Sequence, residues 1–272
     1  MELIPANRCA GGLFAVLRTR ETQRGKGMYR KTEGIVLRET EYNDHDKLLT
    51  VLTRDLGKIT VKARGVKSQR SKLRAACQIT AFSELTLQEY QGRYTLTEAA
   101  TKELFTPLQT DVTLLALASY FLQVTETVAP EEDPVPELLS LLLNSLYALS
   151  KLGRPQLLVK AAFELRLCSI IGFQPDLRGC AVCGNPNPDR INIQQGCLQC
   201  AGCKAGEGLR LPVTAGLLDA LRYIVYADAK KLFSFQLPER TLRELSSIAE
   251  SYLCVRLERG FFTLDFYKSL FI

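Results

Sequence analysis

The stretch that decides the first half of the fold is residues 32–66, TEGIVLRETEYNDHDKLLTVLTRDLGKITVKARGV. Apolar and polar residues alternate along three parts of it, which is the pattern of half-buried β-strands. A polar turn follows each of the first two parts. The first turn is Glu41-Tyr42-Asn43-Asp44, and the second, Asp55-Leu56-Gly57, ends in a glycine. The stretch therefore predicts three consecutive strands, at Thr32–Glu39, Leu48–Thr53 and Ile59–Val66.

The alternation also predicts which side chains share a face. In the first strand, Ile35 and Leu37 lie on the face opposite Gly34, Val36 and Arg38. In the third strand, Lys62 and Arg64 point outward, opposite an inward row of Ile59, Val61 and Ala63.

Strand-like sequence returns after a break. Leu85–Tyr90 and Tyr94–Thr97 read as two further strands joined by a turn at Gly92. Five short strands in about 70 residues, with a break between the third and the fourth, are typical of an OB-type barrel. We therefore expect an α+β protein in which residues 28–105 form a five-stranded OB-type β-barrel, a fold that often binds single-stranded nucleic acid.

Positive charge is concentrated in one segment. Residues 54–74 carry eight Lys or Arg against Asp55 alone, a local charge of +7, whereas the whole chain carries +6. Residues 1–27 add +3, which leaves −4 for the rest of the chain. A basic segment on a mildly acidic body indicates an anionic partner, and phosphates need cations along a strip. The predicted DNA-binding residues, here called the basic strip, are Lys62, Arg64, Lys67, Arg70, Lys72 and Arg74.

Two tyrosines and one histidine belong to the same region. Tyr90 and Tyr94 flank a turn and could stack on bases, but packing in the barrel core or rim is the commoner use of such aromatics. His45 is the one histidine of the chain and sits between two aspartates, where we expect a surface turn. A single histidine also argues against His-dependent nucleophilic catalysis and His-rich catalytic metal centres.

Residues 106–272 have the character of a helical domain. Asp111 is positioned to cap the first helix, and Gly153 and Gly172 are positioned to end the second and third. An aromatic C-terminal segment, Phe261–Ile272, must dock on the body, because it would otherwise expose a large apolar surface. The first of these helices runs from Asp111 to about Val128, the second from Glu137 to Leu152 and the third from Pro155 to about Gly172. Two more helices are predicted, from Pro212 to about Ala227 and from Glu239 to Glu258.

A cysteine-rich insert interrupts these helices at about residues 178–208. Cys180/Cys183 and Cys200/Cys203 form two Cys-x-x-Cys pairs with sixteen residues between them, which is the spacing of a zinc site. Four cysteine ligands leave no open coordination position, so the pattern predicts one structural Zn²⁺. Pairing Cys197 with Cys200 would leave thirteen residues, below the usual range of about 15–20. Three alternatives remain open: a ligand set that includes Cys197, a redox-active dithiol, and a site that has lost its metal.

The sequence lacks the motifs that are typical of several enzyme classes. The chain has no phosphate-binding P-loop, no Gly-rich dinucleotide loop and no G-x-S-x-G motif, so we predict that it is not an enzyme. It also has no signal-peptide layout and no apolar run long enough for a membrane span, and paired cysteines favour metal in a reducing compartment. We therefore expect a cytoplasmic protein. Residues 1–27 are predicted to be a disordered extension, either a basic arm or sequence upstream of a true start at Met28.

These parts together resemble a known family, the bacterial recombination mediator RecO. The resemblance rests on TEGIVL at Thr32–Leu37, on LLTVLTRDLG at Leu48–Gly57, and on ITVKARGVK at 59–67 with Ser71. It also rests on Cys180-x-x-Cys183-Gly184 and Gly196-x-x-x-Cys200-x-x-Cys203. Residues 1–27 lie outside the pattern, and Cys197 stands where a second glycine usually follows Gly196.

The resemblance implies a DNA repair and recombination function in the bacterial nucleoid. Proteins of this family bind single- and double-stranded DNA and anneal complementary strands. The resemblance also implies three protein partners: RecR, the acidic C-terminal tail of the single-strand binding protein and, indirectly, RecA, which is loaded onto DNA coated by that protein. Alternatives are an RNA-binding or transcription accessory protein, since barrels with zinc ribbons occur there, and a zinc-dependent enzyme acting on nucleic acid.

Overall fold

The computed structural model describes residues 27–203 and 206–271. The prediction of disorder for residues 1–27 therefore falls outside the described residues, apart from Gly27. The described chain is mixed α+β, with five strands first and helices after them. None of the described helices combines the length and apolar composition that crossing a membrane would need.

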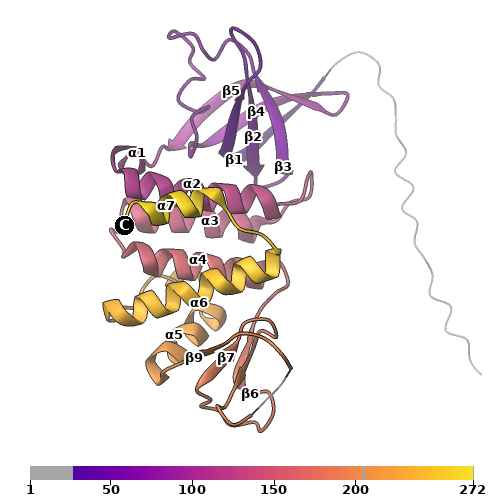
Figure 1. Ribbon diagram of the computed structural model, residues 1–272. Helices are drawn as coiled ribbons and strands as arrows, with labels where there is room; N and C mark the ends of the chain where they lie inside the picture. The colour runs from indigo at the N-terminus through magenta and orange to yellow at the C-terminus, as the bar shows by residue number, and fades with distance from the viewer. Residues whose placement is uncertain (1–26, 204–205, 272) are drawn as a thin grey trace, which may run out of the picture.

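The five strands close into a barrel, drawn in indigo and purple in Figure 1. The strand order is β1-β2-β3-β5-β4, antiparallel except where β3 runs parallel to β5. All five predicted strands are confirmed, but β1, β4 and β5 are longer than predicted. Strand β3 ends at Ala63, so Arg64 lies in the following turn and not on a strand. The strands are β1 (Met28–Glu41), β2 (Lys47–Thr53), β3 (Gly57–Ala63), β4 (Phe82–Tyr90) and β5 (Arg93–Glu103).

Strand β1 is buried on both faces where it meets the helices. Val36 points into the barrel, where it joins the core of Leu49, Val51, Ile59 and Val61. Ile35 and Leu37 lie on the opposite face and belong to the helical core instead. The predicted faces are therefore correct for Ile35, Val36 and Leu37. The prediction was wrong for Arg38, because a β-bulge after Val36 turns Arg38 to the outer face, where it binds Glu126 of α2. Packing of the helices against the outside of the barrel explains why both faces are apolar.

A backbone contact also joins the barrel to the helices. The amide of Lys58 donates to Pro130 O at 3.2 Å, and the amide of Glu132 donates to Lys58 O at 3.1 Å, so residues 130–132 extend the edge of β3. Gly57 adopts φ +68° and lies against Asp133 so closely that an added Cβ would come within 2.4 Å of its backbone nitrogen. The contact therefore requires glycine at this position.

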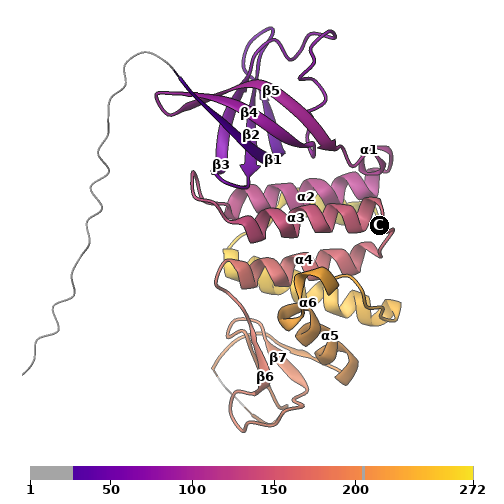
Figure 2. The same ribbon diagram turned by 180° about the vertical axis from the view of Figure 1, so that it is seen from behind.

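Beyond the barrel the chain forms stacked helices (Figures 1 and 2). Both views place α2 and α3 between the barrel and the pair α4 and α6, with α5 farther from the barrel. Asp111 caps α2 as predicted, accepting hydrogen bonds from the amides of Thr113 and Leu114. The helices are α1 (Pro107–Thr110), α2 (Val112–Val128), α3 (Pro136–Ser150), α4 (Gln156–Ile170), α5 (Ala215–Tyr226), a 3₁₀ turn (Ala229–Lys231), α6 (Glu239–Leu257) and α7 (Phe262–Ser269).

The aromatic C-terminal segment docks, as predicted. Helix α7 packs on α2, and the ring of Phe261 before it lies 5.7 Å from the ring of Tyr120. Its inner face buries Leu264 and Tyr267. Its outer face leaves Phe262 and Phe266 exposed.

Helix α4 is buried nearly all round and carries two charged residues into the core. Lys160 and Glu164 are 1% and 0% exposed and form an ion pair of 2.9 Å. Lys160 also binds Glu250 on α6 at 2.9 Å, and the hydroxyl of Tyr120 on α2 donates to Glu164 at 2.8 Å. This polar cluster joins three helices, and the predicted pattern of α4 did not include it.

The cysteine-rich insert is a small sheet and not a loop, which corrects the prediction. Its strands are β6 (Asp176–Cys180), β7 (Arg190–Asn192), β8 (Cys197–Gln199) and β9 (Arg210–Pro212), in the order β6-β8-β7-β9. The sheet is anchored to the helices, since Arg222 on α5 donates to Leu177 O at 2.8 Å and Tyr252 on α6 donates to Phe173 O at 2.9 Å.

Candidate nucleic-acid interface and metal centre

The connector at residues 64–81, between β3 and β4, holds most of the basic strip. It is fastened to the β1–β2 turn rather than extending freely. The carboxylate of Asp46 accepts a hydrogen bond from the Gly65 amide at 2.9 Å, and the Lys67 ammonium donates to Asn43 O at 2.8 Å. The amide of Lys67 also donates to His45 O at 3.3 Å, so the turn around His45 supports this connector.

Two members of the basic strip are already paired with carboxylates. Lys62 binds Asp46 at 3.0 Å, and Lys67 binds Glu41 at 2.7 Å. The Gly65 amide, followed by Lys62, lowers the pKa of Asp46 to about 2. These two lysines therefore meet nearby carboxylates, and a phosphate would have to compete for them.

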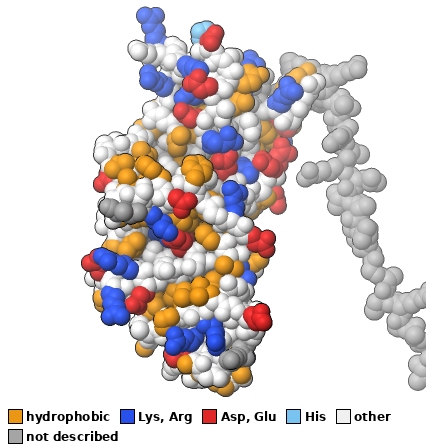
Figure 3. Space-filling model, viewed as in Figure 1, with side chains coloured by type: hydrophobic (Ala, Val, Ile, Leu, Met, Phe, Trp, Pro, Cys, Tyr) orange, Lys and Arg blue, Asp and Glu red, His pale blue; other side chains and the backbone are white. Residues whose placement is uncertain are grey.

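The other four members are exposed and have no ion-pair partner among the described residues: Arg64, Arg70, Lys72 and Arg74. Elsewhere on the barrel, most cations are neutralised. Arg30, Arg38, Lys47, Arg54, Lys58 and Lys102 each bind a carboxylate. Figure 3 shows Lys and Arg side chains at the end of the barrel farthest from the helices.

A hollow of about 670 Å³ lies on the outer face of the barrel beside Lys62 and Arg64. Tyr42 and Tyr90 are 55% and 56% exposed in its wall, whereas Tyr94 is half-buried against the barrel core. The Lys62 ammonium lies 4.5 Å from the centre of the Tyr42 ring. We call this site the tyrosine hollow; its lining combines rings and cations, as stacking of bases beside phosphates requires.

Two residues with functional side chains in the tyrosine hollow were not predicted from the sequence. Tyr42 lies in the β1–β2 turn, and Arg93, exposed and without an ion-pair partner among the described residues, begins β5. Their positions in polar turns were visible in the sequence, but the pairing that brings the turns together was not. Tyr90 and Tyr94 both line the hollow, and Tyr94 also packs on the barrel core, so the packing alternative is confirmed for Tyr94. Stacking on bases stays a prediction.

The basic strip is not one continuous track. Lys62 and Arg64 line the tyrosine hollow, whereas Lys67 and Arg74 line a second hollow of about 660 Å³ that reaches α2. Glu39 and Glu41 share that second hollow, so its charge is mixed. Arg70 and Lys72 line neither hollow and are exposed on the connector.

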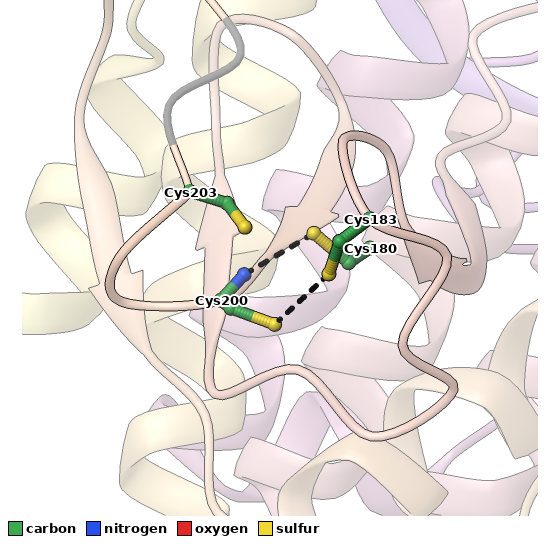
Figure 4. A group of neighbouring side chains, drawn as sticks. All are labelled: Cys180, Cys183, Cys200 and Cys203. Atoms are coloured by element: carbon green, nitrogen blue, oxygen red, sulfur yellow. Dashed lines mark hydrogen bonds between the residues drawn. The ribbon is translucent and has the colours of Figure 1, made fainter.

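The candidate metal centre lies in the insert, at the opposite end of the molecule from the barrel (Figure 1). The sulfurs of Cys180, Cys183, Cys200 and Cys203 all lie within 4.8 Å of one another (Figure 4). Each Cys-x-x-Cys pair closes a turn: the Gly184 amide donates to Cys180 O, and the Cys203 amide donates to Cys200 O. These four residues could hold a metal ion.

The distance between two of the sulfurs matches the value expected for tetrahedral zinc. Zn–S bonds of about 2.3 Å imply sulfurs about 3.8 Å apart, and the Sγ atoms of Cys183 and Cys200 are 3.7 Å apart. Backbone amides of Cys183 and Val182 lower the pKa of Cys180 to about 6. Hydrogen bonding with Cys183, followed by burial, raises the pKa of Cys203 to about 12. Thiolates this close need a cation to compensate their charge.

The remaining described cysteines lie outside this group. Cys197 is in β8, and its sulfur lies 3.8 Å from the side-chain amide of Gln199. Cys168 is buried in α4, and Cys77 is buried beside the barrel core, where desolvation raises the pKa of both thiols to about 12. The geometry therefore favours the predicted set of four over any set with Cys197.

Comparison with known proteins identifies related sequences over most of the chain. The family model "Recombination protein O N terminal" matches residues 28–105, and "Recombination protein O C terminal" matches residues 109–264. DNA repair protein RecO of Acetivibrio thermocellus is 34% identical over 245 residues, which is 89% of this chain and 97% of that protein. Proteins of the same name from Bacillus pumilus and Symbiobacterium thermophilum are each 30% identical, over 82% and 88% of this chain and 87% and 96% of their own lengths.

Proposed function

The chain belongs to the RecO family of DNA repair proteins, and on this premise we propose that it is a recombination mediator acting on single- and double-stranded DNA. The resemblance carried by residues 32–71 and by the cysteine motifs identified the family correctly. The family consists of DNA repair mediators and not of known enzymes, in agreement with the prediction. It implies partners in a DNA repair pathway.

In this proposal residues 28–105 are an OB-type DNA-binding domain, and the basic strip contacts phosphates. The observation that carries it is the contrast between neutralised and free cations on the barrel. Arg64, Arg70, Lys72 and Arg74 are exposed without ion pairs among the described residues, and Arg64 lines a hollow that also holds tyrosines. A free cation releases counterions from DNA when it binds a phosphate, whereas a paired cation must first give up its carboxylate.

Annealing follows from the same charges. Two complementary strands repel each other, and neutralising both on one basic surface lowers that repulsion, so annealing should weaken with salt. We assign the protein partners to the helical domain, residues 106–272. These partners are RecR and the acidic tail of the single-strand binding protein, and together they would help load RecA onto DNA coated by that protein.

The metal of the insert is proposed to be one structural Zn²⁺ held by Cys180, Cys183, Cys200 and Cys203. Four sulfur ligands fill the coordination sphere, so the ion would stabilise the fold and bind no substrate. The insert packs on α5 and α6, at the far end of the molecule from the barrel. We therefore propose that the metal supports the helical domain and does not contact DNA directly.

The experiment that tests this function is annealing of complementary strands precoated with single-strand binding protein. The chain should accelerate annealing at low salt, and removal of the tail from the coating protein should abolish the acceleration. No acceleration at any salt concentration would refute the mediator function. A variant with alanine at the four free cations, Arg64, Arg70, Lys72 and Arg74, should lose the activity. Its matched control removes the same number of charges at paired positions, Arg38, Lys47, Arg54 and Lys102.

RNA is the second candidate ligand, because rings and free cations suit any single strand. Competition between DNA and RNA oligonucleotides of one sequence separates the two. A mediator of DNA recombination should prefer DNA or bind both equally. A strong preference for RNA would instead support the transcription accessory function.

A further inference from the structure

The two cationic surfaces of the barrel differ in chemistry. Arg64 and Arg93 line the tyrosine hollow, where Tyr42 and Tyr90 expose more than half of their surface. The connector beyond it carries Arg70, Lys72 and Arg74, and residues 64–81 contain no aromatic side chain. One surface therefore offers rings with cations, and the other offers cations without rings, although Arg74 shares its hollow with Glu39 and Glu41.

Single strands and duplexes place different demands on such surfaces. The bases of a single strand are accessible and gain affinity by stacking on aromatic rings, about 1–3 kcal/mol per base. The bases of a duplex are already stacked inside the helix, so the contacts that it offers without sequence reading are its phosphates. Rings add affinity for the first ligand and little for the second.

We propose that the two surfaces divide the ligands: the tyrosine hollow binds single-stranded DNA, and the connector residues Arg70, Lys72 and Arg74 bind duplex DNA. This inference rests on the proposed function and specifies which residues serve each form of DNA. Free cations at both places supply the electrostatic attraction. The tyrosines supply the preference of the hollow for single strands.

The β1–β2 turn joins the two surfaces. Tyr42 lies in the hollow, and the next residues of the same turn, Asn43 and Asp46, accept hydrogen bonds from Lys67 and Gly65 of the connector. A single strand in the hollow therefore lies beside the surface that binds the duplex. Annealing on this barrel would convert a ligand of the hollow into a ligand of the connector, and the product would vacate the hollow for another strand.

The test compares two variants of the full-length protein for binding to a labelled oligonucleotide and to its duplex. Tyr42→Ala with Tyr90→Ala should weaken single-strand binding about tenfold or more, and duplex binding by less than about twofold, since no charge is removed. Arg70→Ala, Lys72→Ala and Arg74→Ala together should lower the salt slope for the duplex by about 2.7, at about 0.9 per lost phosphate contact. The slope for the single strand should change by less than about 1, since the hollow cations remain.

Conservative variants separate binding from folding. Tyr42→Phe with Tyr90→Phe keeps the rings and should retain single-strand affinity, and Arg70→Lys with Arg74→Lys keeps the charges and should retain duplex affinity. The proposed division of ligands would be overturned if either alanine variant lowered the affinity for single strands and for duplex equally. It would also be overturned if the tyrosine-to-alanine variant bound single strands as tightly as the unchanged protein. If the unchanged protein bound neither ligand, the proposed function itself would fail, which is a different result from loss of the division.

Discussion

Replacement of Lys160 by methionine should destabilise the helical domain by about 3 kcal/mol near neutral pH. The Lys160 ammonium is buried and lies 2.9 Å from a carboxylate oxygen of Glu164 and of Glu250. Methionine has a similar length and leaves little cavity, so the main effect is to leave two carboxylates without their shared cation. The variant therefore isolates the electrostatic contribution of this cluster.

The magnitude follows from the partners that remain. Removing one member of a buried ion pair typically costs about 3–5 kcal/mol. Glu250 keeps a second cation, since Lys268 on α7 binds it at 2.8 Å. Glu164 can take up a proton instead, because burial already raises its pKa to about 7 despite the attraction of Lys160. Both features place the expected loss at the lower end of the range.

The same pKa sets the pH dependence. A folded-state pKa of about 7 lies above the ordinary value of 4.5, so the folded protein holds this proton more tightly than the unfolded chain. The stability from Glu164 is therefore complete below its unfolded pKa and is lost as the pH rises through its folded pKa. Lys160→Met raises the folded pKa further and extends the loss to higher pH. The difference between variant and unchanged protein should consequently grow above about pH 7.

Urea unfolding followed by circular dichroism at about pH 6, 7 and 8 measures this effect. Lys268→Met is the matched control, since its side chain is 54% exposed and its pair with Glu250 should contribute less than about 1 kcal/mol. A loss below about 1 kcal/mol for Lys160→Met at every pH would refute the reasoning, as would a loss that stays constant from pH 6 to 8.

Three further predictions follow from the junctions, caps and cysteines. Metal chelation, or Cys200→Ser, should increase hydrogen exchange in residues 173–212 while DNA affinity stays within about twofold; loss of DNA binding with the helices still folded would contradict a supporting role for the insert. Gly57→Ala should cost more than Gly153→Ala in thermal unfolding, because both have positive φ but only Gly57 faces the backbone of Asp133; equal costs would argue against a tight junction. Asp111→Ala should lower stability by about 1 kcal/mol in urea unfolding through loss of the α2 cap, and Asp111→Asn should retain most of it.

Local signals predicted much of the fold. The capping aspartate before α2 and the glycines after α3 and α4 set helix ends close to those observed, because caps act within one turn of the chain. The alternation in β3 predicted its inward row of Ile59, Val61 and Ala63, because successive side chains of a strand point to opposite faces. The cysteine quartet followed from spacing, since a tetrahedral site restricts which cysteines can meet.

Predictions that depended on distant contacts were incomplete. The insert was expected to be a loop, because strands of three residues such as Arg190–Asn192 carry too little alternation to detect. The burial of Lys160 and Glu164 was missed, since their spacing on α4 equally suits an exposed pair. Only the arrival of α2 and α6 encloses them, and these helices come from other parts of the chain.

The family, the ends of α2, α3 and α4 and most of the predicted strand faces followed from the sequence alone, because each depends on neighbours along the chain. Spacing favoured one set of four cysteines, and the tertiary structure brings the sulfurs of that set together. The tertiary structure decided which cations of the basic strip are free. Lys62 and Lys67 are neutralised by Asp46 and Glu41, which the β1–β2 hairpin brings to them, while Arg64, Arg70, Lys72 and Arg74 meet no carboxylate among the described residues. Charge counts along a sequence cannot show this, because an ion pair forms only between groups that folding places within about 4 Å.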